Sequence, residues 1–185
     1  MADFPELRTE RLVLQRLVPS DAAAISRYRS LPEVARYQSW EAFTLEDADR
    51  LVAEQAGVAP DTPGTWLQIA IVADEVVGDC GLHFLDDKQV ELGITLDPAH
   101  QGKGYATEVL RAVLDYLFGV LGKHRAVATT DAENATAAAL FTRLGFRREA
   151  HHVMNVWFKG RWGDEFVFAL LAEEWVADRT RPVNP

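Results

Sequence analysis

Three apolar runs between residues 65 and 97 constrain the fold of this chain most. The runs TWLQIAIV (65–72), VVGDCGLHFL (76–85) and QVELGITLD (89–97) are the segments concerned. They are rich in the β-branched and aromatic residues that favour strands. Only the tripeptides ADE and DDK separate them, and connections this short join antiparallel neighbours. The sequence therefore predicts an antiparallel meander in the middle of the chain.

Helices are expected on the N-terminal side of this meander. A short strand over LVLQRL (12–17) precedes a helical segment that Ser20 is predicted to cap and Pro32 to end. Thr44 followed three residues later by Asp47 predicts a capping box at the start of a second helix.

The C-terminal half alternates helical and extended patterns. Apolar residues recur at helical spacing over 105–121 and again from Asn134 to Leu144, on either side of an extended run over 124–131. Two further runs, 151–158 and 163–171, flank a KGRW turn and predict a closing hairpin. This order predicts an α/β fold in one domain, with a mixed, mostly antiparallel sheet flanked by helices.

Composition narrows the partners that such a domain can have. With 185 residues the chain is long enough to bury one core. A net charge of −9 argues against nucleic acid binding, and it is compatible either with a cationic partner or simply with solubility. Cys80 is the only cysteine, so an internal disulfide is impossible. The sequence starts without a signal-peptide pattern and has no apolar run long enough for a membrane span, which favours a cytoplasmic protein.

The stretch HQGKGYATE (100–108) places two glycines just before a predicted helix. It lacks the spacing of a Walker A loop, and Thr107 stands where a dinucleotide-binding loop needs its third glycine. Gln101, Gly104 and Ala106 do match a pyrophosphate cradle of the form Gln/Arg-x-x-Gly-x-Gly/Ala. The N–H groups and dipole of a helix N-terminus attract such an anion, and Lys103 adds a positive charge. A plain strand-to-helix turn remains the alternative interpretation of the loop alone.

The context of this loop resembles the GNAT superfamily of acyl-CoA-dependent N-acyltransferases. VELGITLDPAHQGKGYATEVLRAVLDYLF is similar to the family's fourth strand, pyrophosphate loop and following helix, and DAENATAAALFTRLGFRR is similar to its next helix. The opening TERLVLQRL and the closing VWFKGRWGDEFVFALLAEEW resemble its RimJ/RimL-like branch, the ribosomal-protein N-terminal acetyltransferases. The resemblance covers a core of about residues 9–175, and 176–185 are expected to form a loose tail.

The resemblance implies a set of contacts with acetyl-CoA. In the family, backbone N–H groups of the loop hold the coenzyme A pyrophosphate, and the end of the preceding strand pairs with the pantetheine arm. Asn134 matches a position that hydrogen-bonds the pantetheine region, and it is equally suited to cap a helix. The positions implied in the loop and strand are Ile94, Thr95, Leu96, Gln101, Gly102, Lys103, Gly104, Tyr105 and Ala106.

Phe141 is the one clear departure from the family pattern. Many members carry a tyrosine here that protonates the leaving thiolate, whereas Phe141 has no proton to give. The position counts among the implied cofactor contacts, and its helical spacing with Ala137 and Leu144 favours a packing role. The thiolate then leaves unaided, or a water molecule or another side chain assists it.

Acyl transfer to an amine requires the neutral amine, which directs attention to candidate bases. Near pH 7.5 roughly a quarter of an α-amine is neutral, against about a thousandth of a lysine. Glu91 is the first candidate base because strand alternation places it on the polar face beside Gly93. His83, on the neighbouring strand, is the second. For Glu91 a solvated or ion-paired role, and for His83 a structural role, are the alternatives.

The remaining reactive and aromatic residues give weaker indications of function. Cys80 and His83 are three residues apart on one strand, so they point to opposite faces, and Cys80 fits a core position. No metal-ligand spacing is present, so no metal is expected. Trp157, Phe158 and Trp162 in the closing hairpin, with Trp175 after it, fit either core packing or the wall of an acceptor pocket or homodimer contact.

These features predict an N-acetyltransferase that transfers the acetyl group of acetyl-CoA to a primary amine by direct attack. The branch resemblance implies a protein N-terminus as acceptor, and a small amine is the other possibility. The alternative is a catalytically silent acyl-CoA-binding module. Neither membrane nor nucleic acid is expected as a partner.

Overall fold

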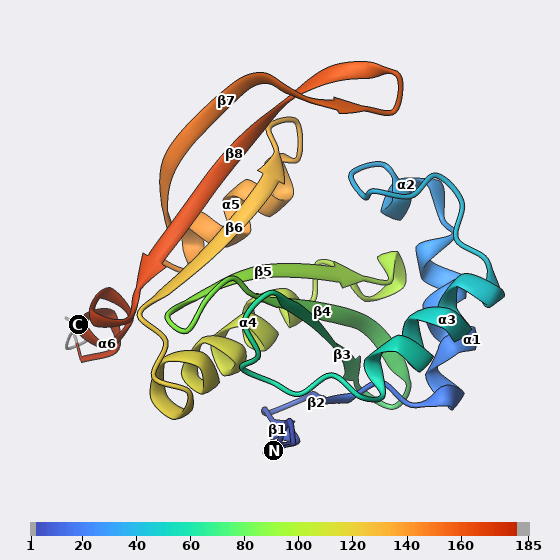
Figure 1. The fold of residues 1–185 in the computed structure, drawn as a ribbon, viewed down its shortest axis with the longest axis horizontal. Helices are drawn as coiled ribbons and strands as arrows, with labels where there is room; N and C mark the ends of the chain where they lie inside the picture. Colours follow the sequence, from blue (N-terminus) through green and yellow to red (C-terminus); the bar gives the residue numbers. More distant parts are fainter. Residues whose placement is uncertain (1–2, 181–185) are drawn as a thin grey trace.

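The computed structural model describes residues 3–180, with side chains as far as Ala177. One sheet of eight strands, ordered β1-β2-β3-β4-β5-β6-β8-β7, carries helices on both sides (Figure 1). Mixed pairing confirms the predicted α/β class, because β5 and β6 are parallel whereas all other neighbours are antiparallel. The strands are β1 (Leu7–Arg8), β2 (Val13–Arg16), β3 (Thr65–Val72), β4 (Val76–Phe84), β5 (Gln89–Leu96), β6 (Arg125–Asp131), β7 (Arg147–Phe158) and β8 (Arg161–Leu171).

The predicted meander is confirmed as β3, β4 and β5. Trp66 pairs with His83, which in turn pairs with Glu91 across the next ladder. This register brings side chains that are far apart in the sequence onto one face of the sheet. On the opposite face Cys80 and its apolar neighbours point into the core.

Three helices lie between β2 and β3 in the chain: α1 (Ala22–Arg29), α2 (Pro32–Ala35) and α3 (Leu45–Gln55). The predicted capping box is confirmed, because Thr44 Oγ1 accepts from the Asp47 N–H and the Asp47 carboxylate accepts from the Thr44 N–H. The predicted Ser20 cap is wrong. Pro19 starts a 3₁₀ turn over Pro19–Asp21, so α1 begins only after Asp21, whose carboxylate accepts from the Val18 N–H at 2.9 Å.

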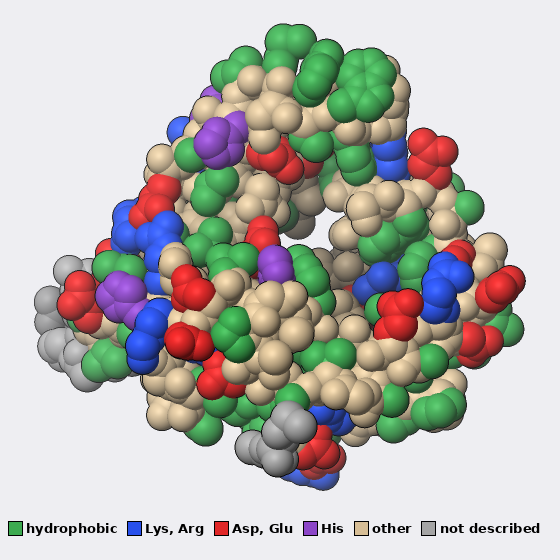
Figure 2. All heavy atoms as spheres, in the orientation of Figure 1, with side chains coloured by type: hydrophobic (Ala, Val, Ile, Leu, Met, Phe, Trp, Pro, Cys, Tyr) green, Lys and Arg blue, Asp and Glu red, His purple; other side chains and the backbone are tan. Residues whose placement is uncertain are grey.

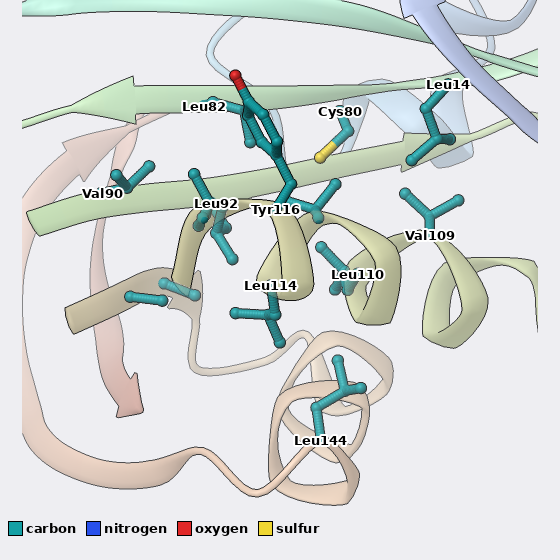
Figure 3. Packing of buried hydrophobic residues seen from close by; sticks show 14 of the residues in the cluster. Leu14, Cys80, Leu82, Val90, Leu92, Val109, Leu110, Leu114, Tyr116 and Leu144 are labelled. Carbon is teal, nitrogen blue, oxygen red and sulfur yellow. The ribbon is translucent and has the colours of Figure 1, made fainter. Parts of the chain in front are cut away.

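The main core lies between the sheet and α4 (Tyr105–Asp115), which continues as a π-helical turn over Tyr116–Val120. Its apolar stripe faces the strands (Figure 3), which removes this surface from water and stabilises the fold. A smaller core joins α1 and α3 to the other face of the sheet through Ile25, Tyr28 and Val52. Residues that Figure 3 labels in the main core include Leu14, Cys80, Leu82, Val90, Leu92, Val109, Leu110, Leu114 and Leu144.

The last elements of the described residues are α5 (Ala135–Arg143), the β7–β8 hairpin and α6 (Ala172–Thr180). Residues 176–180, expected to belong to a loose tail, continue α6, while 181–185 lie outside the described residues. Trp175 anchors α6, because its side chain is buried and its indole N–H donates to Asp115 Oδ1 at 2.9 Å. Among the helices between residues 3 and 180, none combines the length and hydropathy needed to cross a membrane.

Candidate active site

The sheet opens where β5 and β6 separate. Their parallel ladder contains only the pairs from Gln89–Arg125 to Glu91–Val127, and the two strands then diverge. Two cavities adjoin this opening. The loop cavity, about 380 Å³, is bordered by Gln101, Gly102 and Gly104 to Thr107, and the tryptophan cavity, about 320 Å³, by Trp40 and Trp66. Figure 2 shows the molecule hollowed in this region.

The two cavities meet at the end of β5. Both are lined by residues of the loop after α2, of β5 and of the start of α5, so a ligand entering one can reach a ligand in the other. The shared residues are Tyr37, Gln38, Ile94, Thr95, Asn134 and Ala137. This arrangement suits a reaction between two molecules that approach from opposite sides of a sheet.

The glycine loop forms the mouth of the loop cavity. Gly102 and Gly104 have φ angles of 73° and 81°, in the left-handed region that other residues adopt only with strain. Gly104 immediately precedes α4, and the Glu108 N–H bonds to the Gly104 carbonyl at 3.1 Å. The N–H groups of Tyr105, Ala106 and Thr107 therefore have no acceptor within the helix and are available to an anion.

Arg11 holds this loop in place, and sequence reasoning missed it. Its Nη1 donates to the Lys103 carbonyl at 2.9 Å, its Nε donates to Glu108 at 2.7 Å, and its guanidinium lies 4.8 Å from the centre of the Tyr105 ring. Burial raises the pKa of Glu108, but hydrogen bonds from Thr9 and Arg11 outweigh it and leave the pKa lowered. Arg11, two residues before β2, thus holds the loop by a hydrogen bond and the first turn of α4 by an ion pair. No local sequence pattern predicts these contacts of Arg11, because the partners are more than ninety residues apart in the chain.

The remaining residues of the implied cofactor set border the same opening. Ile94, Thr95 and Leu96 lie on β5 beyond its last pair with β6, and Gln101 Nε2 ties the loop to the Leu96 carbonyl at 3.1 Å. Asn134 caps α5 by accepting from the Ala137 N–H at 3.1 Å, which confirms its predicted capping role. Phe141 is buried against Phe146 and Phe168, as its helical spacing predicts, and it also borders the tryptophan cavity.

The structure brings His83 and Glu91 together. His83 Nδ1 lies 3.4 Å from Glu91 Oε2, and about a quarter of each side chain is exposed, 24% and 25%. The His83 ring stacks on Trp66 with 4.5 Å between ring centres. The pair stands beside the tryptophan cavity, whose lining includes Trp66, Gly81 and Gly93, rather than within it. Cys80 points to the other face, as predicted, and burial raises the pKa of its thiol.

A buried ion pair contributes to the wall of the tryptophan cavity, because Arg29 and Gln68 line it. Arg29 Nη2 lies 2.6 Å from Asp79 Oδ1, and the two side chains are 8% and 1% exposed. Tyr28 and Gln68 also donate to the Asp79 carboxylate. The Arg29 guanidinium lies over the Trp40 ring at 4.6 Å. No local sequence pattern indicates this network, because its members lie on α1, β3, β4 and the loop after α2.

The three C-terminal tryptophans differ in whether they pack in the core or stay exposed for an acceptor pocket or a homodimer contact. Trp175 is buried, which confirms core packing for that residue, whereas Trp157 and Trp162 are 60% and 52% exposed and pack against each other at 5.5 Å. Core packing is therefore wrong for these two. Hydrophobic side chains gather over the far end of the hairpin (Figure 2). Within residues 3–180, no three His, Cys, Asp or Glu side chains converge as a metal site requires.

Comparisons with known proteins agree with this architecture. The family profile described as acetyltransferase (GNAT) domain matches residues 11–147. The chain is 30% identical over 170 residues to an uncharacterised N-acetyltransferase, YnaD, of Bacillus subtilis (strain 168), covering 91% of this chain and 98% of that protein. The uS5-alanine N-acetyltransferase of Escherichia coli (strain K12) is 31% identical over 88 residues, 48% of this chain and 45% of that protein.

Solved structures share the fold. A GNAT-family acetyltransferase from Bacillus anthracis superposes with a TM-score of 0.83 and 27% identity, over 91% of this chain and 99% of that one. A spermidine N-acetyltransferase from Vibrio cholerae, solved with CoA and spermine, has a TM-score of 0.78 and 22% identity, over 90% of this chain and 98% of that one. At that identity the second similarity shows the fold alone. The glycine loop, the opened sheet and these matches together show that the chain belongs to the GNAT family of acetyl-CoA-dependent N-acetyltransferases.

Proposed function

We propose that this N-acetyltransferase acts by direct attack of a primary amine on acetyl-CoA, with a protein N-terminal amine as acceptor. The observation that carries the proposal is the junction of the two cavities where β5 leaves β6. The thioester enters through the loop cavity and the amine through the tryptophan cavity. The amine nitrogen bonds to the acetyl carbon, the carbon–sulfur bond breaks, and sulfur leaves with the electron pair.

Acetyl-CoA binding is assigned to the loop and the free edge of β5. Backbone N–H groups from Gln101 to Ala106 hold the pyrophosphate, because a helix N-terminus favours an anion and glycines allow it to approach the backbone. The unpaired edge at Ile94–Leu96 hydrogen-bonds the pantetheine arm as an added strand would. Asn134 and Phe141 border the arm from α5.

Proton removal is assigned to the Glu91–His83 pair. The amine must lose a proton as the carbon–nitrogen bond forms, and a carboxylate beside an imidazole can accept it through water. Both groups retain partial exposure, which lets the proton pass on to solvent. Glu91 stands at the last rung of the β5–β6 ladder, two residues before Gly93, whose lack of a side chain leaves the tryptophan cavity open beside it. The Trp66 ring, which also lines this cavity, stacks on His83.

An α-amine suits this site better than a lysine side chain. Its pKa near 8 leaves a substantial neutral fraction at physiological pH, so a weakly assisted site suffices. The local similarity to the E. coli uS5-alanine enzyme supports the same acceptor class. The names of the spermidine acetyltransferases among the similar structures make polyamines the principal competitor.

An acceptor screen tests this proposal. Release of free CoA is measured with N-terminal peptides that differ in their first residue, with matched N-terminally blocked peptides as controls, and with spermidine, aminoglycosides and amino acids. We expect the highest kcat/KM for an unblocked peptide. A higher kcat/KM for spermidine than for every peptide would reassign the acceptor, and no turnover with any primary amine would refute direct attack on amines.

The exposed end of the β7–β8 hairpin supports a homodimer as a further part of the proposal. Val153, Met154, Trp157 and Trp162 are each at least half exposed, and aromatic residues and methionine are enriched at protein interfaces. Sedimentation of the wild type and of Trp157→Ser tests it. We expect a dimer that the substitution weakens, with Trp66→Ser as the control because its exposed ring lies elsewhere. A monomeric wild type would refute the dimer without affecting the proposed chemistry.

A further inference from the structure

The hydroxyl of Thr130, near the end of β6, is buried without a hydrogen-bond partner. Thr130 is 8% exposed, and its Oγ1 makes no hydrogen bond with any group within residues 3–180. A buried, unpaired hydroxyl costs free energy that a valine of nearly the same shape would not. A threonine at this position therefore indicates a partner that arrives with a ligand.

The position of Thr130 indicates which ligand that is. Thr130 lines the tryptophan cavity together with Asn134 and Phe141. It lies three residues beyond Val127, the last residue of β6 that pairs with β5, and a continued register would set it opposite Ile94. Ile94 is where we place the end of the pantetheine arm. Thr130 therefore borders the space through which the thioester must pass.

Rotation of the Thr130 side chain is needed to turn its hydroxyl toward this space. Oγ1 itself is closed off from solvent, so it does not face the open cavity in the ligand-free rotamer. Rotation about χ1 between staggered wells exchanges the positions of the hydroxyl and the methyl group. A ligand acceptor in the cavity would favour the rotated form, because the hydroxyl gains a hydrogen bond there.

We propose that the Thr130 hydroxyl donates a hydrogen bond to the sulfur of acetyl-CoA while the carbon–sulfur bond breaks, an inference that rests on the proposed function. Sulfur leaves with the electron pair as a thiolate, and hydrogen bonds to a developing anion are stronger than those to a neutral atom. Thr130 keeps its own proton, and the proton released by the amine goes to the Glu91–His83 pair. Phe141, which borders the same cavity, offers no donor.

Two substitutions at this position separate the hydroxyl from the shape of the side chain. Thr130→Val removes the donor and keeps the volume, and Thr130→Ser keeps the donor. We expect Thr130→Val to lower kcat by about 10- to 100-fold with little change in KM for acetyl-CoA, and Thr130→Ser to retain most of the wild-type kcat. Without ligand, Thr130→Val should raise Tm by about 2–4 °C, because it removes an unpaired buried hydroxyl.

A measurement without turnover tests the same contact. Thiolate absorbance gives the pKa of the CoA thiol in its complex with each variant. Loss of the hydrogen bond should raise this pKa by about one unit in Thr130→Val and leave it near the wild-type value in Thr130→Ser.

The outcomes distinguish this inference from the function on which it rests. Failure of the wild type to bind CoA in calorimetry would refute the proposed function. Normal binding with the same bound-thiol pKa in wild type and Thr130→Val would overturn the role of Thr130 alone. A raised KM with unchanged kcat would also overturn it, because the hydroxyl would then bind the arm and not the leaving sulfur.

Discussion

The two cavities that meet at the end of β5 are built in different ways. The mouth of the loop cavity is one continuous segment, Gln101–Ala106, that leads into α4, and its key backbone angles depend on two glycines. The tryptophan cavity is assembled from residues of β3, β4, β5, β6, α1, α5 and the loop after α2. A site made of backbone groups in one segment tolerates substitutions in the surrounding structure. The shape of a site assembled from many elements depends on the position of each of them.

The largest effect on stability is expected at the buried Arg29–Asp79 ion pair beside the tryptophan cavity. Asp79→Ala leaves the Arg29 guanidinium buried without its carboxylate, and we expect a loss of about 3–5 kcal/mol in the free energy of unfolding. Urea denaturation measures it, with the exposed Asp74→Ala as the control. Replacement of both Arg29 and Asp79 by leucine should cost less than Asp79→Ala alone. An effect of Asp79→Ala no larger than that of the control would contradict a structural role for the pair.

The next largest effect is expected in the glycine loop, on binding rather than on stability. Gly104→Val forces a β-branched residue into a φ of 81° and places its Cβ 3.4 Å from Arg11 Nη2. We expect CoA affinity to fall by about 100-fold or more, since the substitution also crowds the approach of a phosphate to the backbone. Calorimetry measures the Kd, and Gly122→Val, at an exposed position with a φ of 65° and no atom nearby, is the matched control. An unchanged Kd would rule out the loop as a pyrophosphate site.

A smaller, pH-dependent effect is expected at Glu91. Glu91→Gln should lower kcat/KM by about tenfold at pH 6.5, where most of the α-amine is protonated, and by less at pH 8.5, where more of it is neutral. The pH–rate profile of a peptide substrate measures this, with Glu173→Gln on α6 as the control. A mutant profile parallel to that of the wild type would exclude Glu91 as the base.

The smallest effect is expected at an exposed counterpart of the Arg29–Asp79 pair. Hydrogen bonds from Arg125, with a further one from Arg147, lower the pKa of Glu149 to about 2. A lowered folded-state pKa means that this contribution to stability is present above pH about 4.5 and lost as the pH falls toward 2. Because the pair is exposed to solvent, Glu149→Gln should remove less than about 1 kcal/mol at pH 7. Urea denaturation at pH 7 and pH 3 checks that the difference between wild type and mutant shrinks at the lower pH.

Local patterns were sufficient for most of the fold. The alternation and short turns of residues 65–97 predicted β3 to β5, and the Thr44–Asp47 box predicted the start of α3. The Ser20 cap failed because a proline-initiated 3₁₀ turn took its place. Trp157 and Trp162 were ambiguous because a hydrophobic side chain carries no information about whether a neighbour will cover it.

The sequence by itself determined the glycine loop, the meander and the cap of α5, since each depends on backbone conformations and on contacts between residues near one another in the chain. Only the tertiary structure decided that Arg11 braces the loop, that His83 meets Glu91, that Asp79 balances Arg29 and that Thr130 is left unpaired. These contacts join strands and helices whose register and packing are set by the whole sheet, so their partners cannot be read from neighbouring residues.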